Sequence, residues 1–362
     1  MNNKPKRILH VVTYMGRGGI ETMLMNYYRH IDRNVLQFDF LVHRDFKADF
    51  DDEIESLGGK IYRVPPMNPL KYSYWKSIIN FFKSHTYEIV HCHLNYKSGI
   101  VLAAAKIAKV PVRIAHAHTA SMSFGLAKLA RILMKPLIPL TATNFQACSI
   151  NAGEAIFNKK PFIVVPNAID TEVYSFNENK RQLMREKLGV EDRFTILHVG
   201  RFTKEKNHMF LIDIFFELLN KNPNSKLLLV GDGPLKNEIM LKTNQFPKGT
   251  VEFLGVRNDV PDIMQAADVF VLPSLFEGLP VTMIEAQAAG LLCIKADTIT
   301  DECIITDLVK SIPVDDYKIW VDTIMSAKDL HRTNQNEQIS LNGYDIKNEA
   351  KKLTKLYLFG EL

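Results

Sequence analysis

Short runs of apolar and β-branched residues alternate along the chain with longer segments in which apolar residues recur at helical spacing. This alternation is typical of βα units whose strands form parallel sheets. In the first half the pattern predicts strands at residues 7–13, 38–42, 60–64, 88–92, 112–115 and 145–149, and helices such as 19–30 and 97–109. In the second half it predicts strands at residues 194–199, 226–230, 251–253, 269–272 and 291–295. We therefore expect an α/β protein with two doubly wound sheets.

The sheet pattern pauses at the turn-rich segment 165–170, and a polar stretch follows at residues 175–181. We place a domain boundary there. Residues 1–170 and 171–342 are then two domains of similar size, and residues 343–362 form a tail.

Two further segments have the pattern of amphipathic helices. In the tail, apolar residues recur at helical spacing, so the helix must pack on another part of the protein: Ile346, Ala350, Leu353 and Tyr357. Residues 124–135 combine a broad apolar face with three cations on one side, Lys128, Arg131 and Lys135. That profile fits a helix lying on an anionic membrane surface, and a half-buried core helix with extended lysines fits nearly as well.

Composition and charge exclude several classes of protein. The chain has 362 residues, of which 46% are hydrophobic and 23% charged, an ordinary globular composition for two domains. Its 45 Lys and Arg against 40 Asp and Glu give a net charge of only +5, which does not point to nucleic acid. No segment approaches the roughly 20 uninterrupted apolar residues of a membrane span, and the first apolar run lacks a signal-peptide cleavage pattern. The four cysteines have no C-x-x-C spacing, so we expect reduced thiols in a cytoplasmic protein.

A glycine-rich turn, residues 16–19, joins the first expected strand to the first expected helix. Such a turn lets a ligand approach the backbone N–H groups at the positive end of a helix. The dinucleotide-binding pattern G-x-G-x-x-G/A does not fit, because Glu21 stands at its last position. A loop that faces an acceptor or a phosphate and a plain tight turn both remain open.

Two H-x-H pairs, His91 with His93 and His116 with His118, lie at the carboxyl ends of two expected strands. Ligands of open α/β sheets bind at this edge. Alternate residues of a strand point to one side, so each pair presents two imidazoles together. Hydrogen bonding to a substrate hydroxyl, a structural role and a four-histidine zinc site are all compatible with this pattern.

Glycines and cations follow two strands of the second half. Gly200, Arg201 and Lys206 come after one strand, and a guanidinium together with an ammonium suits a diphosphate, although an ordinary basic surface loop has the same spacing. Gly231 and Gly233 follow the next strand, where they permit a ligand to approach closely or simply make a turn.

Residues 267–290 carry the most informative pattern. An apolar strand ends in a loop that contains Glu277, and Pro280 stands where the first turn of a helix is expected. Glu285 lies about one and a half turns into that helix. The backbone N–H groups at the helix start would face a phosphate, while the two carboxylates hydrogen-bond sugar hydroxyls on either side of it. A surface loop followed by a helix with a solvated Glu fits the composition equally well.

Metal-binding patterns are scarce in the sequence. The D-x-D pair of Asp49 and Asp51 has the pattern of a solvated helix start, so we expect no metal there. The sequence holds no phosphate-binding P-loop, no serine-nucleophile elbow and no H-E-x-x-H motif.

Together these segments resemble the retaining, two-domain GT-B glycosyltransferases of family 4. The resemblance rests on GRGGIE at residues 16–21, HAHT at 116–119, GRFTKEKN at 200–207, GDGP at 231–234 and the E-x7-E arrangement of Glu277 and Glu285. It spans nearly the whole chain. The segments that look closest to bacterial exopolysaccharide and capsule enzymes are residues 7–32, 37–44 and 274–291.

The resemblance implies a fold and an activity. The fold has two Rossmann-like domains that face a central cleft, the first for the acceptor and the second for the nucleotide sugar, with the carboxyl-terminal helix crossing back to the first. The reaction moves a hexose or N-acetylhexosamine from a UDP-sugar to a polyprenyl-diphosphate-linked oligosaccharide, with retention of configuration and without a metal or other cofactor. Such an enzyme works in the cytoplasm, in peripheral contact with the inner face of an anionic membrane, and has no nucleic-acid partner.

The resemblance also implies roles for individual residues. The catalytic set is His118 near the anomeric carbon, Arg201 and Lys206 at the donor diphosphate, and Glu277 at the donor sugar. Glu285 contacts the ribose. The other donor-binding positions are Gly18, Gly19, Gly200, Gly231, Gly233, Val256, Gly278, Leu279 and Pro280. The acceptor or cleft positions are Glu21, His93 and His116.

Two other functions fit the same fold. One is a sugar-nucleotide epimerase or hydrolase, which would use the diphosphate site but no lipid acceptor. The other is a non-catalytic partner subunit that recruits another transferase.

Overall fold

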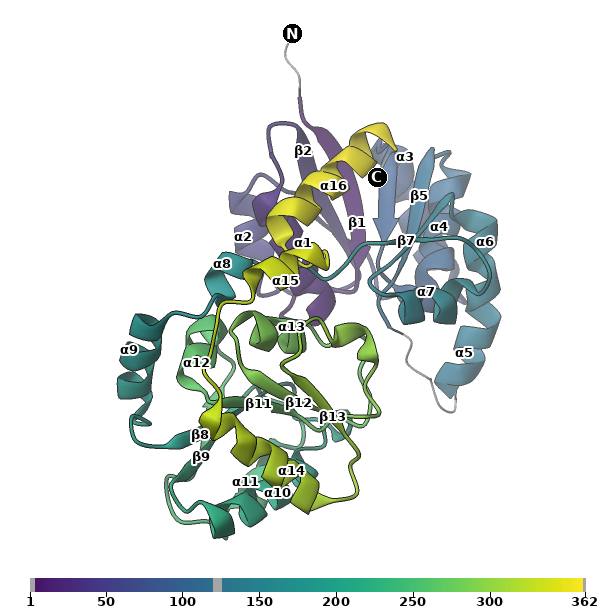
Figure 1. Ribbon diagram of the computed structural model, residues 1–362. Coiled ribbons are helices and arrows are strands. Elements are labelled where there is room, and N and C mark those ends of the chain that lie inside the picture. Colours follow the sequence, from purple (N-terminus) through teal and green to yellow (C-terminus); the bar gives the residue numbers. More distant parts are fainter. Residues whose placement is uncertain (1–3, 120–125, 361–362) are drawn as a thin grey trace. The chain divides into compact units, whose positions relative to one another are not determined.

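The computed structural model describes residues 4–119 and 126–360, which divide into two compact units. Unit 1 contains the described residues up to Ala168 and the helix that begins at Ile346 (Figure 1). Unit 2 is Ile169–Asp345. Each unit is built on one parallel sheet, as the alternation of apolar runs and helical segments predicts.

The sheet of unit 1 has seven parallel strands in the order β3-β2-β1-β4-β5-β6-β7. Their bounds are β1 Lys6–Val12, β2 Leu36–Val42, β3 Ile61–Arg63, β4 Ile89–Cys92, β5 Val112–Ala117, β6 Asn144–Ala147 and β7 Ile163–Val164. The helices are α1 Gly19–His30, α2 Asp51–Ser56, α3 Tyr72–Ser84, α4 Ser98–Ile107, α5 Leu126–Met134, α6 Ile138–Thr141, α7 Ile150–Phe157 and α16 Ile346–Phe359. Because β1, β4 and β5 are neighbours, their carboxyl ends bring distant segments together.

The sheet of unit 2 has six parallel strands in the order β10-β9-β8-β11-β12-β13. Their bounds are β8 Phe194–Val199, β9 Ser225–Val230, β10 Val251–Gly255, β11 Val269–Leu272, β12 Leu292–Ala296 and β13 Val309–Ile312. The helices are α8 Thr171–Tyr174, α9 Glu178–Leu188, α10 His208–Lys221, α11 Lys236–Thr243, α12 Val260–Ala266, α13 Val281–Ala288, α14 Tyr317–Met325 and α15 Asn336–Leu341. The chain order reverses between β8 and β11, the arrangement at which doubly wound sheets bind ligands.

The last helix, α16, belongs to unit 1. Its four periodic apolar residues are all buried in the core cluster of that unit: Ile346, Ala350, Leu353 and Tyr357. They pack with residues of α1, which lies beside α16 (Figure 1). The amphipathic pattern of the tail is thereby explained, since its apolar face is removed from water.

Local signals fix where individual helices begin and end. The Asn177 side chain accepts a hydrogen bond from the Lys180 backbone N–H at 3.0 Å, which caps the start of α9. The helix ends at Gly189, whose φ of +59° is the left-handed conformation that glycine adopts without strain. α9 is thus delimited by its own sequence.

The expected strands of both halves are present, and β8 and β11 have the predicted bounds. Two strands escaped prediction, β7 and β13, which lie at sheet edges. β7 lies in the apolar run 162–165 but has only two paired residues, and two of the four β13 residues are exposed, so β13 has no continuous apolar run. Among the described residues, no helix is both long and apolar enough to cross a membrane.

Candidate functional site

In unit 2, the loop after β8 and the loop after β11 lie side by side because the two strands are hydrogen-bonded neighbours. The Leu275 N–H donates to the Glu205 carbonyl at 2.8 Å, and the Asn207 amide donates to the Pro273 carbonyl at 3.2 Å. These contacts bring the cationic loop to the loop that carries Glu277.

Lys206 and Glu277 form an ion pair in which Nζ lies 2.6 Å from Oε1. Their side chains are only 19% and 13% exposed, so water screens the pair weakly. Arg201 is exposed and makes no side-chain hydrogen bond or ion pair with the described residues. The structure thus brings together two of the predicted residues and leaves the guanidinium of Arg201 available to an anion.

The loop with Glu277 leads into α13, whose amino-terminal cap is Pro280. Pro280 has no capping side chain, and the Met283 N–H donates to the Pro280 carbonyl at 3.0 Å, so the N–H groups of Val281 and Thr282 are left for another acceptor. Leu279 and Pro280 are buried and Gly278 is half-buried, which fixes the backbone of the turn. An uncapped helix start beside an ammonium is a favourable place for a phosphate.

Glu285 lies one turn further along α13 and is 7% exposed. Its Oε1 accepts a hydrogen bond from the Tyr174 hydroxyl at 2.8 Å. Burial raises the pKa of Glu285 to about 7, and the hydrogen bond from Tyr174 opposes this shift. Sequence analysis missed Tyr174, since a single tyrosine in α8 belongs to no motif.

Gly231 and Gly233 have a structural explanation. A Cβ at Gly231 would lie 2.1 Å from the Gly200 carbonyl oxygen, and one at Gly233 would lie 2.5 Å from the Phe202 carbonyl oxygen. Gly231 also has a φ of +136°, which side chains rarely tolerate. These glycines let the loop after β9 pack against the loop after β8, so the space next to them is filled by backbone.

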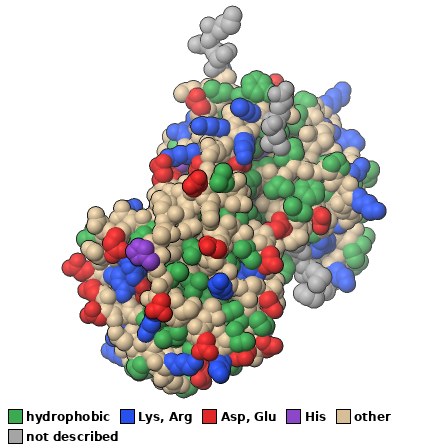
Figure 2. All heavy atoms as spheres, in the orientation of Figure 1, with side chains coloured by type: hydrophobic (Ala, Val, Ile, Leu, Met, Phe, Trp, Pro, Cys, Tyr) green, Lys and Arg blue, Asp and Glu red, His purple; other side chains and the backbone are tan. Residues whose placement is uncertain are grey.

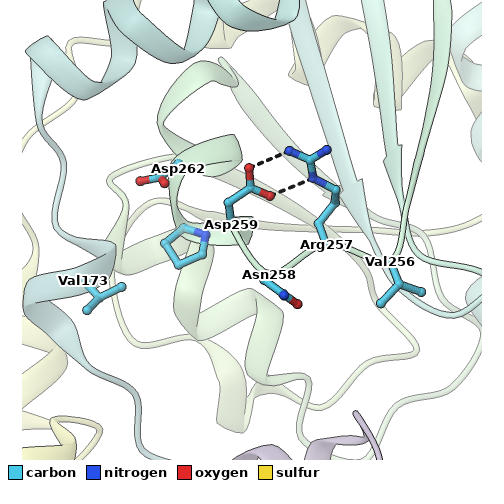
Figure 3. A pocket seen from close by; sticks show the side chains of 7 residues that line it. Val173, Val256, Arg257, Asn258, Asp259 and Asp262 are labelled. Atoms are coloured by element: carbon cyan, nitrogen blue, oxygen red, sulfur yellow. Dashed lines mark hydrogen bonds and ion pairs between the residues drawn. The ribbon is translucent and has the colours of Figure 1, made fainter. Parts of the chain in front are cut away.

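Val256 lines an open pocket of about 530 Å³ at the end of β10 (Figure 3). The lining residues are Val173, Val256, Arg257, Asn258, Asp259, Pro261 and Asp262. Arg257 donates two hydrogen bonds to the Asp259 carboxylate, at 2.7 and 2.5 Å, and this pair forms one wall. Val173 comes directly before Tyr174, so α8 connects this pocket to Glu285.

In unit 1, the glycine-rich turn forms the start of α1. Gly18 is its amino-terminal cap and offers no side chain to the free N–H groups. A Cβ at Gly18 would lie 2.3 Å from a Glu21 carboxylate oxygen, whereas one at Gly19 would meet nothing within 4 Å. Burial raises the pKa of Glu21. Gly18 is therefore needed for the Glu21 side chain to fold back, and Gly19 borders open space.

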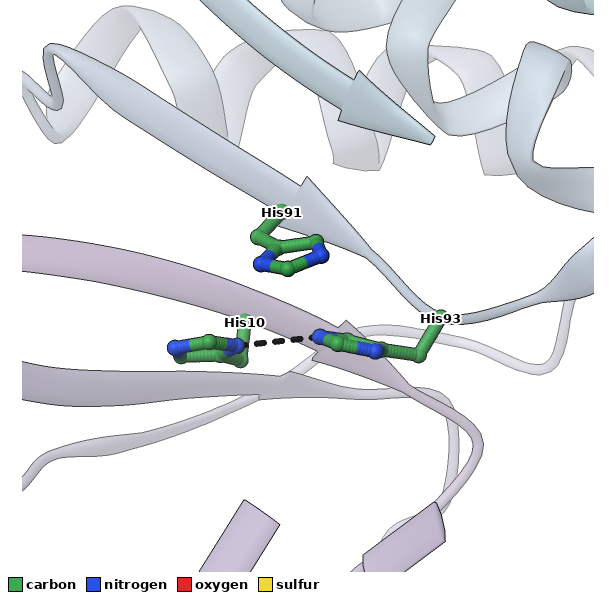
Figure 4. A group of neighbouring side chains, drawn as sticks. All are labelled: His10, His91 and His93. Carbon is green, nitrogen blue, oxygen red and sulfur yellow. Dashed lines mark hydrogen bonds between the residues drawn. The ribbon is translucent and has the colours of Figure 1, made fainter. Parts of the chain in front are cut away.

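The two H-x-H pairs meet at the carboxyl ends of β4 and β5, where His10 of β1 joins them. Figure 4 shows His10, His91 and His93 with their rings close together. The five imidazoles are all buried and form two hydrogen-bonded chains: Tyr357 with His91 and His116, and His10 with His93 and His118. Sequence analysis did not assign His10 or Tyr357 to this cluster, because neither residue belongs to an H-x-H pair or another motif.

Two overlapping triads of this cluster have the donor atoms of a metal site: His10 with His91 and His93, and His93 with His116 and His118. Nitrogens around a tetrahedral zinc lie about 3.3 Å apart, because each Zn–N bond is about 2.0 Å long. The nitrogens of His93 and His118 are 2.9 Å apart and already bonded to each other. The rings as placed are hydrogen-bonded to one another, and the zinc site stays one of the predictions for this cluster.

The D-x-D pair corrects one expectation. Asp51 is 3% exposed and accepts hydrogen bonds from Arg63 and from the Ala48 N–H, so this carboxylate is not solvated, whereas Asp49 and Asp52 of the same helix start are exposed. Asp49 faces Arg17 instead, at 3.7 Å. Each carboxylate therefore has its own cationic partner.

The basic side of α5 also differs from expectation. The Arg131 guanidinium and the Lys135 ammonium both donate to the Ala155 carbonyl, at 3.0 and 2.8 Å, near the carboxyl end of α7. These cations complement the negative end of that helix. Three apolar residues of α5 face outward, with exposed fractions of 53%, 58% and 67% for Leu129, Ile132 and Leu133. Figure 2 shows hydrophobic and basic side chains together over the α4 to α6 region of unit 1.

Comparison with known proteins agrees with this geometry. The family described as Glycosyltransferase Family 4 matches residues 17–173, and the family described as Glycosyl transferases group 1 matches residues 193–326. EpsF of Bacillus subtilis (strain 168), named as a glycosyltransferase, is 36% identical over 379 residues, which covers 99% of this chain and 97% of EpsF.

A second relative and a solved structure extend the comparison. The Escherichia coli UDP-Gal:alpha-D-GlcNAc-diphosphoundecaprenol alpha-1,3-galactosyltransferase is 30% identical over 306 residues, covering 78% of this chain and 79% of that enzyme. The structure of Anabaena Alr3699/HepE in complex with UDP has a TM-score of 0.74 at 18% identity and covers 96% of this chain and 94% of that one. The structural likeness confirms the predicted GT-B type of fold.

Proposed function

The chain belongs to the group 1 and family 4 glycosyltransferases, and from that premise we propose which sugar nucleotide it uses and where the sugar goes. The donor is a UDP-hexose or UDP-N-acetylhexosamine, and the acceptor is a polyprenyl-diphosphate-linked oligosaccharide of exopolysaccharide or capsule biosynthesis. The product retains the anomeric configuration of the donor.

One observation carries the proposal, the Lys206–Glu277 pair beside the uncapped start of α13. Glycosyl transfer places negative charge on the leaving diphosphate, so preorganised cations and N–H groups aimed there lower the barrier. Lys206, Arg201 and the first turn of α13 supply them. Glu277 holds the hydroxyls of the sugar, and His118 contacts the sugar near its anomeric carbon.

The reaction needs no protein nucleophile. The acceptor hydroxyl oxygen forms the new bond to the anomeric carbon on the face from which the diphosphate leaves. The bond between that carbon and the diphosphate oxygen breaks, and the hydroxyl proton passes to the leaving phosphate. The ion pair with Lys206 favours the ionised form of Glu277, which accepts hydrogen bonds from the sugar hydroxyls.

The nucleoside occupies the region of Glu285 and the Val256 pocket. Glu285 contacts the ribose, and uracil enters the open pocket at the end of β10. The proposal is supported by the UDP in the HepE complex and by the UDP-galactose in the name of the Escherichia coli relative.

The acceptor is lipid-linked, and the enzyme works in the cytoplasm in peripheral contact with the membrane. The name of the Escherichia coli relative specifies a GlcNAc-diphosphoundecaprenol acceptor. In this chain the outward-facing Leu129, Ile132 and Leu133 of α5 provide apolar side chains for the lipid surface. Lys128 is exposed on the same helix and suits anionic headgroups.

The reaction requires no metal ion. Cations and helix N–H groups take the place of a divalent metal at the diphosphate. In the histidine cluster, His93 Nδ1 and His118 Nε2 form a hydrogen bond with each other.

Calorimetric titration tests the proposal, first with UDP and then with a panel of UDP-sugars, in buffer with and without EDTA. We expect binding that persists in EDTA and favours one sugar, followed by turnover of that donor with a polyprenyl-diphosphate-linked acceptor and retention in the product. Hydrolysis or epimerisation without transfer would instead assign the alternative enzyme class. If no nucleotide binds, the chain is a non-catalytic partner subunit.

A further inference from the structure

Three buried imidazoles of unit 1 form one continuous hydrogen-bonded chain. His10 Nδ1 lies 3.0 Å from His93 Nε2, and His93 Nδ1 lies 2.9 Å from His118 Nε2. The three side chains are 0%, 2% and 8% exposed, so His118 is the end nearest to the surface. His10 Nε2 and His118 Nδ1, the outer nitrogens of the chain, have no hydrogen-bonding partner in the described part of the protein.

The chain has a direction because its members are neutral. Burial lowers the pKa of His10 and of His118 to about 3, and it lowers the pKa of His93 well below the ordinary value. A neutral imidazole has one N–H and one lone pair. His93 can keep both of its hydrogen bonds only if it accepts from one neighbour and donates to the other. All three N–H groups therefore point the same way.

The surroundings of His10 decide which way that is. Its ring centroid lies 4.2 Å from that of Phe38 and 5.7 Å from that of Phe40, and the residue is fully buried. Both outer nitrogens of the chain are buried, so either direction leaves one N–H without an acceptor among the described residues, and such N–H groups are rare in proteins. His118 follows β5 at the carboxyl edge of the sheet, where a ligand can supply the acceptor, whereas Phe38 and Phe40 enclose His10. His10 therefore keeps its lone pair at the enclosed Nε2 and donates from Nδ1 to His93. His93 in turn donates to His118 Nε2, which leaves an N–H at His118 Nδ1.

We propose that His10 and His93 are positioning residues that hold His118 as the Nδ1–H tautomer, so that His118 presents a hydrogen-bond donor to the substrate. The inference rests on the proposed function for the identity of the ligand, an oxygen of the sugar nucleotide. It deepens that function, because a histidine that already carries a proton at its free nitrogen does not remove the proton of the acceptor. That proton is then free to pass to the leaving phosphate.

A parallel chain in the same cluster provides a matched control. The Tyr357 hydroxyl lies 2.5 Å from His91 Nδ1, and His91 Nε2 lies 3.0 Å from His116 Nδ1. The His91 and His93 rings are close, with centroids 4.2 Å apart. No hydrogen bond joins the two chains among the described residues. Tyr357→Phe therefore disturbs the same cluster without removing a donor from the His10 chain.

The experiment is a long-range ¹H–¹⁵N correlation spectrum of the full chain labelled with ¹⁵N-histidine, recorded at pH 7.5 after EDTA treatment, with His118 assigned through His118→Gln. We expect the Nδ1–H tautomer of His118 in the wild type and in Tyr357→Phe. His10→Phe removes the donor to His93, and we expect a mixture of His118 tautomers. His10→Asn places an amide donor near Nδ1 and restores the Nδ1–H form.

Kinetics then connects the tautomer to function. We expect His10→Phe to lower kcat about tenfold with little change in the KM for the donor, since one oriented hydrogen bond is lost, and His10→Asn to regain most of that loss. An Nε2–H tautomer of His118 in the wild type, or a tautomer unchanged in a folded His10→Phe protein, overturns the proposal. If His10→Phe does not fold, the wild-type spectrum alone decides. The spectrum needs no turnover, so its result stands even if the proposed activity fails.

Discussion

The Lys206 ammonium lies 2.6 Å from the Glu277 carboxylate, although 71 positions separate the two residues in the sequence. The pair satisfies both charges while no substrate is bound. A diphosphate and a sugar would compete for these groups, so each side chain has a partner in both states. Because Lys206 is assigned to the diphosphate and Glu277 to the sugar, binding of UDP and of the UDP-sugar tests the two roles separately.

We expect Lys206→Ala to weaken UDP binding and to lower transfer by about 100-fold or more, because a preorganised cation at the leaving group is lost. Glu277→Gln should lower transfer comparably while UDP still binds, since Glu277 is assigned to the sugar. Titrations with UDP and the UDP-sugar, together with donor turnover, measure both effects. Lys221→Ala is the matched control, because Lys221 pairs with Asp322 at an exposed position. Full activity of either site variant would contradict the assignment.

Glu285 gives a prediction about stability and pH. Its pKa is raised to about 7 in the folded protein, above its ordinary value of 4.5, so the folded state holds the proton more tightly. The unfolding free energy contributed by this group therefore falls as the pH rises from about 4.5 to 7. Glu285→Gln removes the charged form, and we expect its melting temperature to exceed that of the wild type by a few °C at pH 8, roughly 2–4 °C per kcal/mol, but hardly at pH 4.5.

The same variant should bind UDP more weakly, because Glu285 is assigned to the ribose. Tyr174→Phe is the companion variant. It removes the hydrogen bond that lowers the pKa of Glu285, so we expect a further rise of that pKa. If the difference in melting temperature between Glu285→Gln and the wild type is the same at pH 8 and at pH 4.5, this carboxylate is not the titrating group.

Much of the fold could be predicted because buried parallel strands are continuous apolar runs. β8 and β11 have this form, whereas the edge strand β13 does not, and the edge strand β7 is only two residues long. The sequence does not state which strands are neighbours. The contact between Lys206 and Glu277 depends on β11 lying beside β8, and only the sheet order reveals it.

The partners of the predicted site residues were beyond prediction for the same reason. Tyr174 reaches Glu285 across 111 positions, and Tyr357 reaches His91 across 266. Neither tyrosine belongs to a motif. The glycines after β9 show the opposite case, where a motif was visible but its physical reason, close packing on the carbonyl of Gly200, required coordinates.

The histidine cluster predicts sensitivity to acid. Burial lowers the pKa of each of its five histidines below the ordinary 6.5, so the unfolded chain binds protons that the folded unit does not. The contribution of these histidines to stability is therefore full above about pH 6.5 and is lost as the pH falls toward 3, by roughly 1 kcal/mol per histidine and pH unit. Urea unfolding at pH 7.5, 6.5 and 5.5 measures the slope. His10→Phe should reduce it by about one proton, and an unchanged slope would contradict the burial of His10 as a neutral ring.

The cations that contact α7 and the exposed apolar residues of α5 have different expected roles. Arg131 and Lys135 donate to the carboxyl end of α7, so replacing them with Ala should lower stability by about 1 kcal/mol and affect membrane binding little. Leu129, Ile132 and Leu133 face outward, so replacing them together with Ser should leave stability nearly unchanged but abolish flotation with liposomes that contain anionic lipid. Leu241→Ser, a change at a residue of unit 2 that is 71% exposed, is the control for general loss of surface hydrophobicity. Unchanged flotation of the triple variant would show that α5 does not contact the membrane, and its apolar face would then be expected to bind a protein.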